Sequence, residues 1–279
     1  MSRRQLRIQG VEMGVEERGG GPNSRGTLVL LHGFTGSAAS WGNLLDELAE
    51  DGYRVIALDL LGHGTSTAPR DPGRYTMFHA QQDILTALQQ LGVQAGKAIL
   101  LGYSMGGRVA LYISYSYYFR ALILESASPG LAETHEREQR KKSDYALAEH
   151  IENVGVEEFV AYWENLPLFA SQKNLPVERW EAQRRQRLNN RSLGLANSLR
   201  GLGTGEQPPL HEQLNRLDLP VLLLAGELDD KFCGIAREMA EHLPQSQLKI
   251  IPEAGHTLHL ERPEQFKEAV LTFCTDMLP

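Results

Sequence analysis

The sequence of 279 residues is poor in cysteine and has no long apolar run. Its two cysteines, Cys233 and Cys274, are too few for a disulfide framework and lack the spacing of a zinc site, which indicates buried thiols in a reducing compartment. No segment approaches the length of a membrane-spanning helix, and the N-terminal stretch contains no apolar run long enough for a signal peptide. We therefore expect a cytoplasmic protein that does not insert into a membrane.

An excess of positive charge is also absent. The chain carries 28 Lys and Arg residues against 35 Asp and Glu residues, a formal net charge of −7. Proteins that bind nucleic acid usually present a basic patch or stripe, so this balance argues against a nucleic-acid partner. It does not exclude an anionic small molecule, because a few local arginines can outweigh a mildly negative surface.

Short apolar runs recur along the chain, and helix-like stretches separate several of them. The runs occupy residues 27–32, 54–60, 98–102, 121–126, 220–226 and 247–252. Their continuous rather than alternating apolar character is typical of strands that are buried on both faces. Residues 40–52 and 77–92 carry leucine and isoleucine at helical spacing. This alternation predicts an α/β fold with a mostly parallel central sheet and helices on both faces.

The pattern changes between residues 130 and 205. This segment is rich in Glu, Arg, Gln and Asn with interspersed aromatics, and it has helical periodicity without a convincing strand. We expect a helical cap inserted between two strands, although a set of additional surface helices would leave the same pattern. The core would then consist of residues 1–129 and 206–279, with residues 130–205 as the cap.

A serine between glycines follows one of the apolar runs. The stretch GYSMG, residues 102–106, ends the run AILLG and begins a helix-like segment, MGGRVALYI. This is the setting of a nucleophile elbow, in which a sharp, strained turn lifts the hydroxyl of Ser104 out of the sheet. The small neighbours allow the helix to return close to the strand, and the helix N-terminus favours developing negative charge. The alternative is a glycine-rich turn that exposes a serine without a chemical role.

A serine hydroxyl needs a base, and the chain supplies candidates in the order Ser, Asp, His. An acidic cluster of Glu227, Asp229 and Asp230 follows a predicted strand. His256 lies in a loop after another predicted strand, where loops of open α/β sheets carry function, and His259 is its rival. These residues predict a proton relay that activates the serine.

Negative charge that develops on a substrate oxygen needs hydrogen-bond donors that are held in place beforehand. In an elbow architecture one donor is the backbone N–H of the residue after the serine, here Met105. The second comes from the loop after the first apolar run, LLHGFTGSAASW, where we assign the N–H of Phe34. The loss of one such donor costs roughly 3 kcal/mol in the transition state. We expect the ring of His32 to brace this loop.

Five motifs make the chain similar to the α/β-hydrolase superfamily over nearly its full length. They are LLHGFTGSAASW, LDLLGHGTSTAP, GYSMGG, AGELDDKF and EAGHTLHLERPEQF. The resemblance implies that Asp229, three positions after Gly226, is the acid of the triad and that His256 is its base. It does not name a reaction, because esterases, carbon–carbon hydrolases and some lyases share this machinery.

Arginines near the predicted site carry information about the substrate. Arg108 lies one turn beyond the serine on the same face of the following helix. A guanidinium binds a carboxylate through two parallel hydrogen bonds, so this position favours a carboxylated substrate over a neutral ester. Arg137, Arg140 and Arg187 lie in the expected cap, where each either faces the same cavity or belongs to a solvated helix face. Several arginines at one cavity would indicate a small polycarboxylate.

Further motifs resemble one family of lyases, the 2-succinyl-6-hydroxy-2,4-cyclohexadiene-1-carboxylate synthases of menaquinone (vitamin K2) biosynthesis. They are GYSMGGRVAL, GHGTSTAPRDPGRYTM, ESASPGLAETHERE, YWENLPLFAS, RLNN and GELDDKF, and they continue through the predicted cap. By this resemblance, the substrate-binding residues are Tyr103, Arg108, Arg137, Trp163 and Arg187. Members of the family often carry a glutamine early in the cap, where this chain has Ala132, so no glutamine is assigned.

The resemblance implies a chemistry that reuses hydrolase equipment. Ser104, activated by His256 and Asp229, would remove a proton beside the succinyl ketone of 2-succinyl-5-enolpyruvyl-6-hydroxy-3-cyclohexene-1-carboxylate, and pyruvate would leave. The N–H groups of Phe34 and Met105 would hold the enolate oxygen, and neither a metal nor an organic cofactor is needed. The partner is then a small polycarboxylate, and we expect the enzyme to be a monomer or a weak homo-oligomer.

Two other hypotheses remain open at this point. A serine hydrolase that acts on a carboxylated ester or a ring-cleavage diketone is the alternative function, and it would pass through an acyl-enzyme. A catalytically inactive binding protein on the same fold is the other, and it predicts little effect of Ser104→Ala.

Overall fold

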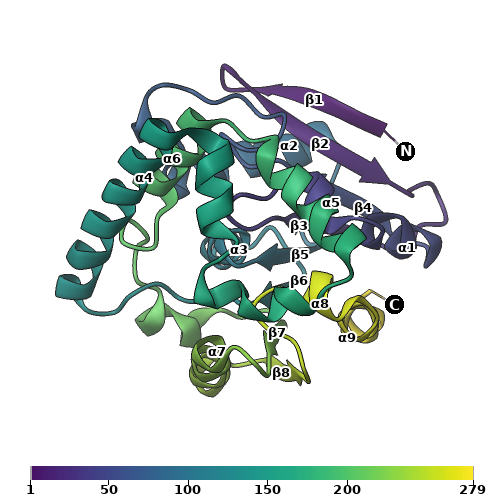
Figure 1. The fold of residues 1–279 in the computed structure, drawn as a ribbon. Coiled ribbons are helices and arrows are strands. Elements are labelled where there is room, and N and C mark those ends of the chain that lie inside the picture. Colours follow the sequence, from purple (N-terminus) through teal and green to yellow (C-terminus); the bar gives the residue numbers. More distant parts are fainter. Residues whose placement is uncertain (1, 279) are drawn as a thin grey trace.

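Eight strands form a single sheet in the computed structural model, which describes residues 2–278 (Figure 1). They are β1 (Ser2–Ile8), β2 (Val11–Arg18), β3 (Thr27–Leu31), β4 (Arg54–Leu58), β5 (Ala98–Tyr103), β6 (Ala121–Glu125), β7 (Val221–Gly226) and β8 (Ser246–Ile251). Their order across the sheet is β1-β2-β4-β3-β5-β6-β7-β8. β3 to β8 run parallel to one another, whereas β1 and β2 form an antiparallel hairpin that extends one edge. Each predicted apolar run contributes one parallel strand, which confirms the predicted fold class.

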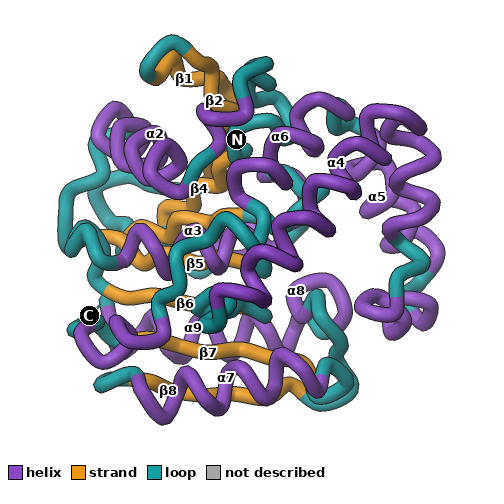
Figure 2. The backbone as a smooth tube through the Cα atoms, turned by 90° about the vertical axis from the view of Figure 1, so that its left-hand side faces the viewer, coloured by secondary structure: helices purple, strands orange, loops and turns teal. Residues whose placement is uncertain are grey.

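Three helices cover one face of the sheet, and two cover the other. The first set is α2 (Met77–Gln90), α3 (Met105–Ser114) and α7 (Asp230–His242), and the second is α1 (Leu44–Glu50) and α9 (Pro263–Met277). Alternate residues of β3 divide between them: Val29 and Leu31 pack with the first set, whereas Leu28 and Leu30 pack with the second. All four side chains are buried, which explains why the run is apolar throughout. Figure 2 shows β5 to β8 side by side, with α3 and α7 lying over them.

The segment between β6 and β7 forms a helical cap. It consists of α4 (Thr134–Trp163), η3 (Pro167–Asn174), α5 (Val177–Leu188) and α6 (Ser192–Leu202). α4 bends at Gly155, whose φ of 82° and ψ of 172° interrupt the helix. α4 and α6 share a small apolar core, and Phe34 of the loop after β3 packs against that core. The cap is therefore joined to the sheet at the loop that we expect to supply an oxyanion donor.

Shorter helical segments complete the fold. They are η1 (Ala38–Trp41), η2 (Pro72–Tyr75), η4 (His211–Arg216) and α8 (Leu258–Glu261). Both cysteines are buried, and neither is in a disulfide. None of the helices within residues 2–278 combines the length with the apolar character that crossing a bilayer requires.

Candidate active site

Ser104 occupies the sharp turn between β5 and α3, with a φ of 51° and a ψ of −110°. A left-handed φ costs a residue with a side chain roughly 1–3 kcal/mol, so the surrounding structure must hold it. Close packing of α3 provides this constraint. A Cβ atom on Gly106 would lie 2.2 Å from the carbonyl oxygen of Leu31, and one on Gly102 would lie 2.4 Å from that of Gly106. Only glycine at both positions lets the helix approach the sheet this closely.

The structure brings Ser104, His256 and Asp229 together. His256 Nε2 lies 3.0 Å from Ser104 Oγ, and His256 Nδ1 lies 2.7 Å from Asp229 Oδ2. A carboxylate can only accept, so Nδ1 carries the hydrogen and Nε2 is left to accept the serine proton. Asp230 begins α7 at an exposed position, whereas Asp229 is 8% exposed and His256 is 1% exposed. The geometry therefore selects Asp229 from the acidic cluster.

Two buried glutamates that the sequence analysis missed hold the histidine loop. Glu261 accepts hydrogen bonds from the backbone N–H groups of Gly255 at 2.7 Å and Thr257 at 3.1 Å. Glu125 accepts one from the backbone N–H of His259 at 3.1 Å and contacts that ring at 2.8 Å. His259 is thus committed to Glu125 and does not reach the serine. A glutamate at the end of an otherwise apolar run, ALILE, is the sequence signal that could have identified Glu125.

His32 braces the loop after β3, as the sequence analysis expected. Its Nδ1 donates to the carbonyl oxygen of Gly33 at 2.8 Å, and its Nε2 accepts from the backbone N–H of Leu60 at 3.0 Å. Both bonds together require a neutral ring with the hydrogen on Nδ1. Burial accordingly lowers the pKa of His32 below its usual value. The ring therefore joins the loops that follow β3 and β4.

The loop that His32 braces lies beside the serine. A Cβ atom on Gly33 would lie 3.5 Å from Ser104 Cβ. Within residues 2–278, neither the N–H of Phe34 nor that of Met105 donates to a backbone or side-chain acceptor. Both residues line the cavity of Ser104, and the role of their N–H groups as an oxyanion hole stays a prediction.

A cavity of about 210 Å³ opens above the serine. Its walls include Phe34, Ser104, Met105 and His256 from the core and Trp163 from the cap. Three cations also line it: Arg108, Arg140 and Lys231. In the described part of the chain no group of three or more His, Cys, Asp or Glu residues is arranged to hold a metal ion. The site thus combines a polarised hydroxyl, free amide donors and positive charge.

Arg108 is the most buried of these cations, with 8% exposure. Its guanidinium donates to Gln207 Oε1 at 3.0 Å and to the carbonyl oxygen of Leu202 at 2.7 Å, and both acceptors are neutral. Among residues 2–278 it forms no ion pair. Burial and the neighbouring charge of Arg140 lower the pKa of Arg108 from 12.5 to about 10, while Asp144 acts in the opposite direction. The side chain remains charged at neutral pH and is held ready for an anion.

Of the two arginines early in α4, Arg140 reaches the cavity and Arg137 does not. The Arg137 guanidinium donates to the carbonyl oxygens of Leu131 at 3.0 Å and Ala132 at 2.5 Å, so it fixes the chain that enters α4. Arg140 lines the cavity, and its Nε donates to Asp144 at 2.8 Å. The prediction that Arg137 binds substrate stays a prediction, and Arg140, almost one helical turn further along and 44% exposed, is the arginine of this pair that lines the cavity.

The other predicted substrate-binding residues are divided between two adjoining cavities. Trp163 and the ring of Tyr103 line the cavity of Ser104. Arg187 does not: it is buried over the ring of Phe169, 5.1 Å from the ring centroid, and its guanidinium lies 3.9 Å from Glu164. It faces an adjoining cavity of about 540 Å³ that shares Phe34, Tyr103 and Phe169 with the first. Arg187 could meet only a substrate that extends from one cavity into the other.

This geometry agrees with the comparison to known proteins. A family model described as the alpha/beta hydrolase fold matches residues 26–263. The chain belongs to the α/β-hydrolase fold family. Within it, a Bacillus subtilis (strain 168) protein assigned as a 2-succinyl-6-hydroxy-2,4-cyclohexadiene-1-carboxylate synthase is 46% identical over 92% of this chain and 93% of that protein. The synthase of that name from Serratia proteamaculans (strain 568) is 34% identical, over 91% and 94% of the two chains.

A solved structure extends the comparison to three dimensions. MenH from S. aureus superposes on this α/β hydrolase with a TM-score of 0.90 and 36% identity, over 95% of this chain and 99% of that one. Because the similarity spans nearly the whole length, it includes the cap as well as the sheet. Within the α/β hydrolases, the chain therefore groups with these synthases.

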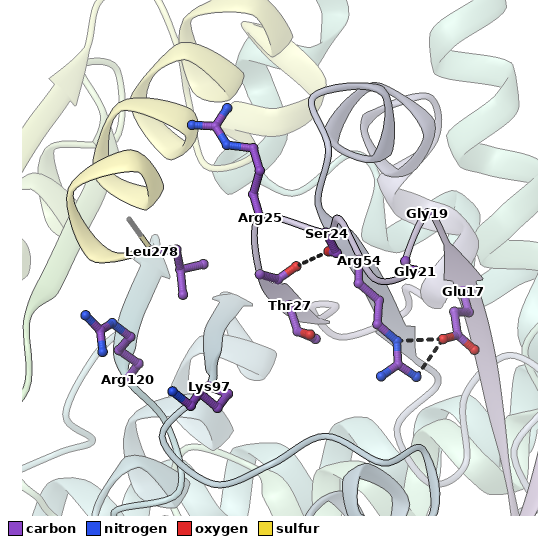
Figure 3. A pocket seen from close by; sticks show the side chains of 12 residues that line it. Glu17, Gly19, Gly21, Ser24, Arg25, Thr27, Arg54, Lys97, Arg120 and Leu278 are labelled. Atoms are coloured by element: carbon purple, nitrogen blue, oxygen red, sulfur yellow. Dashed lines mark hydrogen bonds and ion pairs between the residues drawn. The ribbon is translucent and has the colours of Figure 1, made fainter.

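The α/β hydrolase has a larger hollow at the N-terminal ends of strands β3 to β6, on the side of the sheet away from Ser104. This hollow, of about 650 Å³, is lined by Arg25, Arg54, Lys97 and Arg120. Figure 3 shows the three guanidinium groups on different sides of the hollow, with Arg54 paired to Glu17 at 2.7 Å. Arg120 donates to the carbonyl oxygen of Met277. These cations do not converge on one point and no triad lies nearby, so the smaller cavity is the candidate active site.

Proposed function

We propose that this chain is a lyase that eliminates pyruvate from 2-succinyl-5-enolpyruvyl-6-hydroxy-3-cyclohexene-1-carboxylate in menaquinone biosynthesis. The observation that carries the proposal is the presence of Ser104 and Arg108 at one cavity: a hydroxyl within reach of a base, and a buried guanidinium bound only to neutral oxygens. A buried charge without a counter-ion is unfavourable, and a substrate carboxylate would offset that cost. Membership among the synthases supports the same assignment.

In this proposal Ser104 acts as a base. It takes the proton from the carbon beside the succinyl ketone and passes its own proton to His256, while Asp229 stabilises the imidazolium. The electron pair of the broken C–H bond forms an enolate, whose oxygen accepts hydrogen bonds from the N–H groups of Phe34 and Met105. The pair then shifts through the ring double bond and breaks the C–O bond to the enolpyruvyl group. The released enolate of pyruvate takes the proton from His256 at its methylene carbon and becomes pyruvate, which leaves the imidazole neutral and Ser104 protonated.

The cavity offers several groups to the carboxylates of this substrate. We assign Arg108 and Arg140 to them, because a guanidinium matches a carboxylate with two parallel hydrogen bonds. Two buried polar atoms on the same walls, Ser126 Oγ and Trp163 Nε1, have no partner among residues 2–278. Such an orphaned group costs roughly 1–3 kcal/mol. A polar substrate that satisfies both groups would remove that cost, which supports a polyoxygenated ligand.

The direct test is pyruvate release. Purified enzyme and the succinyl-enolpyruvyl-cyclohexene acid are combined with lactate dehydrogenase and NADH, and loss of NADH absorbance reports the pyruvate formed. We expect turnover that depends on Ser104 and a cyclohexadiene product. An absence of pyruvate above the uncatalysed rate would refute the proposal.

The alternative is a serine hydrolase for a carboxylated ester or diketone, which the triad distances of 3.0 and 2.7 Å equally favour. The two mechanisms differ in covalent chemistry, because a hydrolase forms an acyl-enzyme and a serine base does not. Intact mass spectrometry of enzyme quenched during turnover distinguishes them. A substrate-derived adduct on Ser104 would favour hydrolysis.

We further propose that the enzyme works in the cytoplasm as a monomer or a weak homo-oligomer. The two buried thiols that form no disulfide support a reducing compartment. Light scattering during gel filtration tests the oligomeric state, and a stable assembly at low micromolar concentration would contradict the proposal.

A further inference from the structure

The residues next to the serine and the histidine are bonded to each other. Tyr103 precedes Ser104 and Thr257 follows His256, and the Tyr103 hydroxyl lies 2.6 Å from Thr257 Oγ1. Thr257 is 1% exposed. This bond joins the end of β5 to the loop between β8 and α8. It therefore runs beside the 3.0 Å contact between His256 and Ser104 and connects the same two chain segments.

A cap residue uses the same oxygen. Gln172, in η3, is 3% exposed, and its Nε2 donates to Thr257 Oγ1 at 2.9 Å. Because an amide nitrogen only donates, the threonine oxygen accepts this bond. Its hydroxyl hydrogen can then point to Tyr103, or the oxygen can accept a second bond from Tyr103. In both arrangements a single hydroxyl joins the serine turn, the histidine loop and the cap.

The triad needs such a connection for two reasons. Its serine lies in a left-handed conformation that relaxes unless neighbouring groups hold it. Its histidine lies 152 positions further along the chain, on a loop that Glu261 and Glu125 stabilise without contacting the serine. Proton transfer requires the two heavy atoms to stay at about 2.6–3.2 Å, and a displacement of 1 Å can cost about 100-fold in rate.

We propose that Thr257, together with Tyr103 and Gln172, is a positioning residue that fixes the distance between Ser104 and His256 and couples that distance to the cap. Tyr103 is a substrate-binding residue by the family resemblance, and in this arrangement its hydroxyl holds the histidine loop. The role concerns activation of the serine itself. It therefore does not depend on which substrate the enzyme turns over.

The decisive comparison is Thr257→Val with Thr257→Ser. Valine keeps the shape and branching of threonine but removes the hydroxyl, whereas serine keeps the hydroxyl. Thr272→Val is the matched control, because among residues 2–278 the Thr272 hydroxyl donates only to the backbone carbonyl oxygen of Glu268, at 2.8 Å on the surface of α9. The first readout is the second-order rate at which a small neutral phosphonofluoridate labels Ser104. The second is kcat and KM for pyruvate release.

We expect Thr257→Val to slow labelling and kcat by about 10- to 100-fold with KM within twofold, because the relay is displaced and the binding groups remain. In the profile of kcat against pH, the plateau value of kcat should fall. Thr257→Ser should recover to within about threefold of the wild-type rate, and Thr272→Val should match the wild type. Gln172→Leu should slow labelling by a smaller factor, because the bond to Tyr103 remains.

Loss of thermal stability with labelling and kcat within twofold of wild type would overturn the proposal, because the hydroxyl would then be only structural. If Thr257→Val does not fold, Tyr103→Phe carries the same test, since it breaks the same bond and leaves the one from Gln172. An absence of pyruvate release by the wild type would refute the proposed function and leave the labelling comparison valid.

Discussion

Replacement of Arg108 by methionine should weaken substrate binding strongly while it changes the free energy of unfolding only a little. Methionine fills similar volume without charge, so it removes the anion site with little change in packing. A pKa lowered from 12.5 to about 10 corresponds to about 3 kcal/mol that the fold loses by keeping this guanidinium charged and buried. The substitution removes that cost. It also leaves Gln207 Oε1 and the Leu202 carbonyl without a donor, at roughly 1–3 kcal/mol each.

These contributions oppose each other, so the free energy of unfolding should change by no more than about 3 kcal/mol. Substrate affinity has no such compensation. Loss of a desolvated charge pair with a substrate carboxylate costs roughly 2–5 kcal/mol, which is about 30- to several-thousand-fold in kcat/KM. Urea denaturation measures the first quantity, and the coupled pyruvate assay measures the second.

Two results would refute this reasoning. If kcat/KM of Arg108→Met equals that of the wild type, the guanidinium does not bind substrate, and the main support for a carboxylated substrate is lost. If the free energy of unfolding of the variant falls by well over about 3 kcal/mol, the arginine is held for its bonds to Gln207 and Leu202. Its charge would then be incidental.

Three further predictions follow from the site and its surroundings. Ser104→Ala should reduce kcat for pyruvate release by at least about 10³-fold with KM nearly unchanged, because the hydroxyl acts in the transition state; a loss below tenfold in the coupled assay would contradict a base role. Arg140→Gln should raise KM about tenfold and Arg137→Gln should raise it less than twofold. Steady-state kinetics of the two variants measures this difference, and a larger rise for Arg137→Gln would assign Arg137 to the substrate instead. Burial lowers the pKa of His32 and lowers that of His63 to about 3, so only the unfolded chain takes up these protons below about pH 6.5. Stability should therefore be fully present above pH 6.5 and fall by up to about 1.4 kcal/mol per pH unit for each histidine below it, and equal urea midpoints at pH 7 and pH 5 would contradict this.

The parallel sheet was predictable because burial on both faces leaves a strong signal. Strands β3 to β8 correspond to the apolar runs, of which β8 alone alternates, with its lysine and glutamine exposed. The β1–β2 hairpin was not predicted. β1 lies at the sheet edge and carries Arg3, Arg4 and Arg7, and among residues 3–8 it buries only Ile8 fully. Its sequence is therefore typical of a polar segment rather than of a strand.

The site was predictable where a local motif fixes the backbone, and not where distant segments meet. The turn at Ser104 needs glycine at Gly102 and Gly106 for steric reasons that operate within a few residues. The bond between Gln172 and Thr257 joins positions 85 apart, and no local spacing encodes it. Nor does local spacing decide between Arg137 and Arg140, which are almost one turn apart in α4: Arg140 lines the cavity, whereas Arg137 donates to the carbonyl oxygen of Ala132.

Some of the unfavourable features of this protein lie at the cavity of Ser104 and at the one that adjoins it, and others lie elsewhere in residues 2–278. Thr35, Ser104 and Ser126 adopt left-handed backbone conformations in the loops after β3, β5 and β6, with φ of 66°, 51° and 48°. Arg108 adds a buried charge, and Ser126 adds an orphaned hydroxyl. Each costs roughly 1–3 kcal/mol, and a sequence under selection for stability alone would have replaced them with glycine or apolar residues. Because ligands of open α/β sheets bind at the carboxyl ends of the strands, we infer that a ligand uses those features that line the cavity of Ser104.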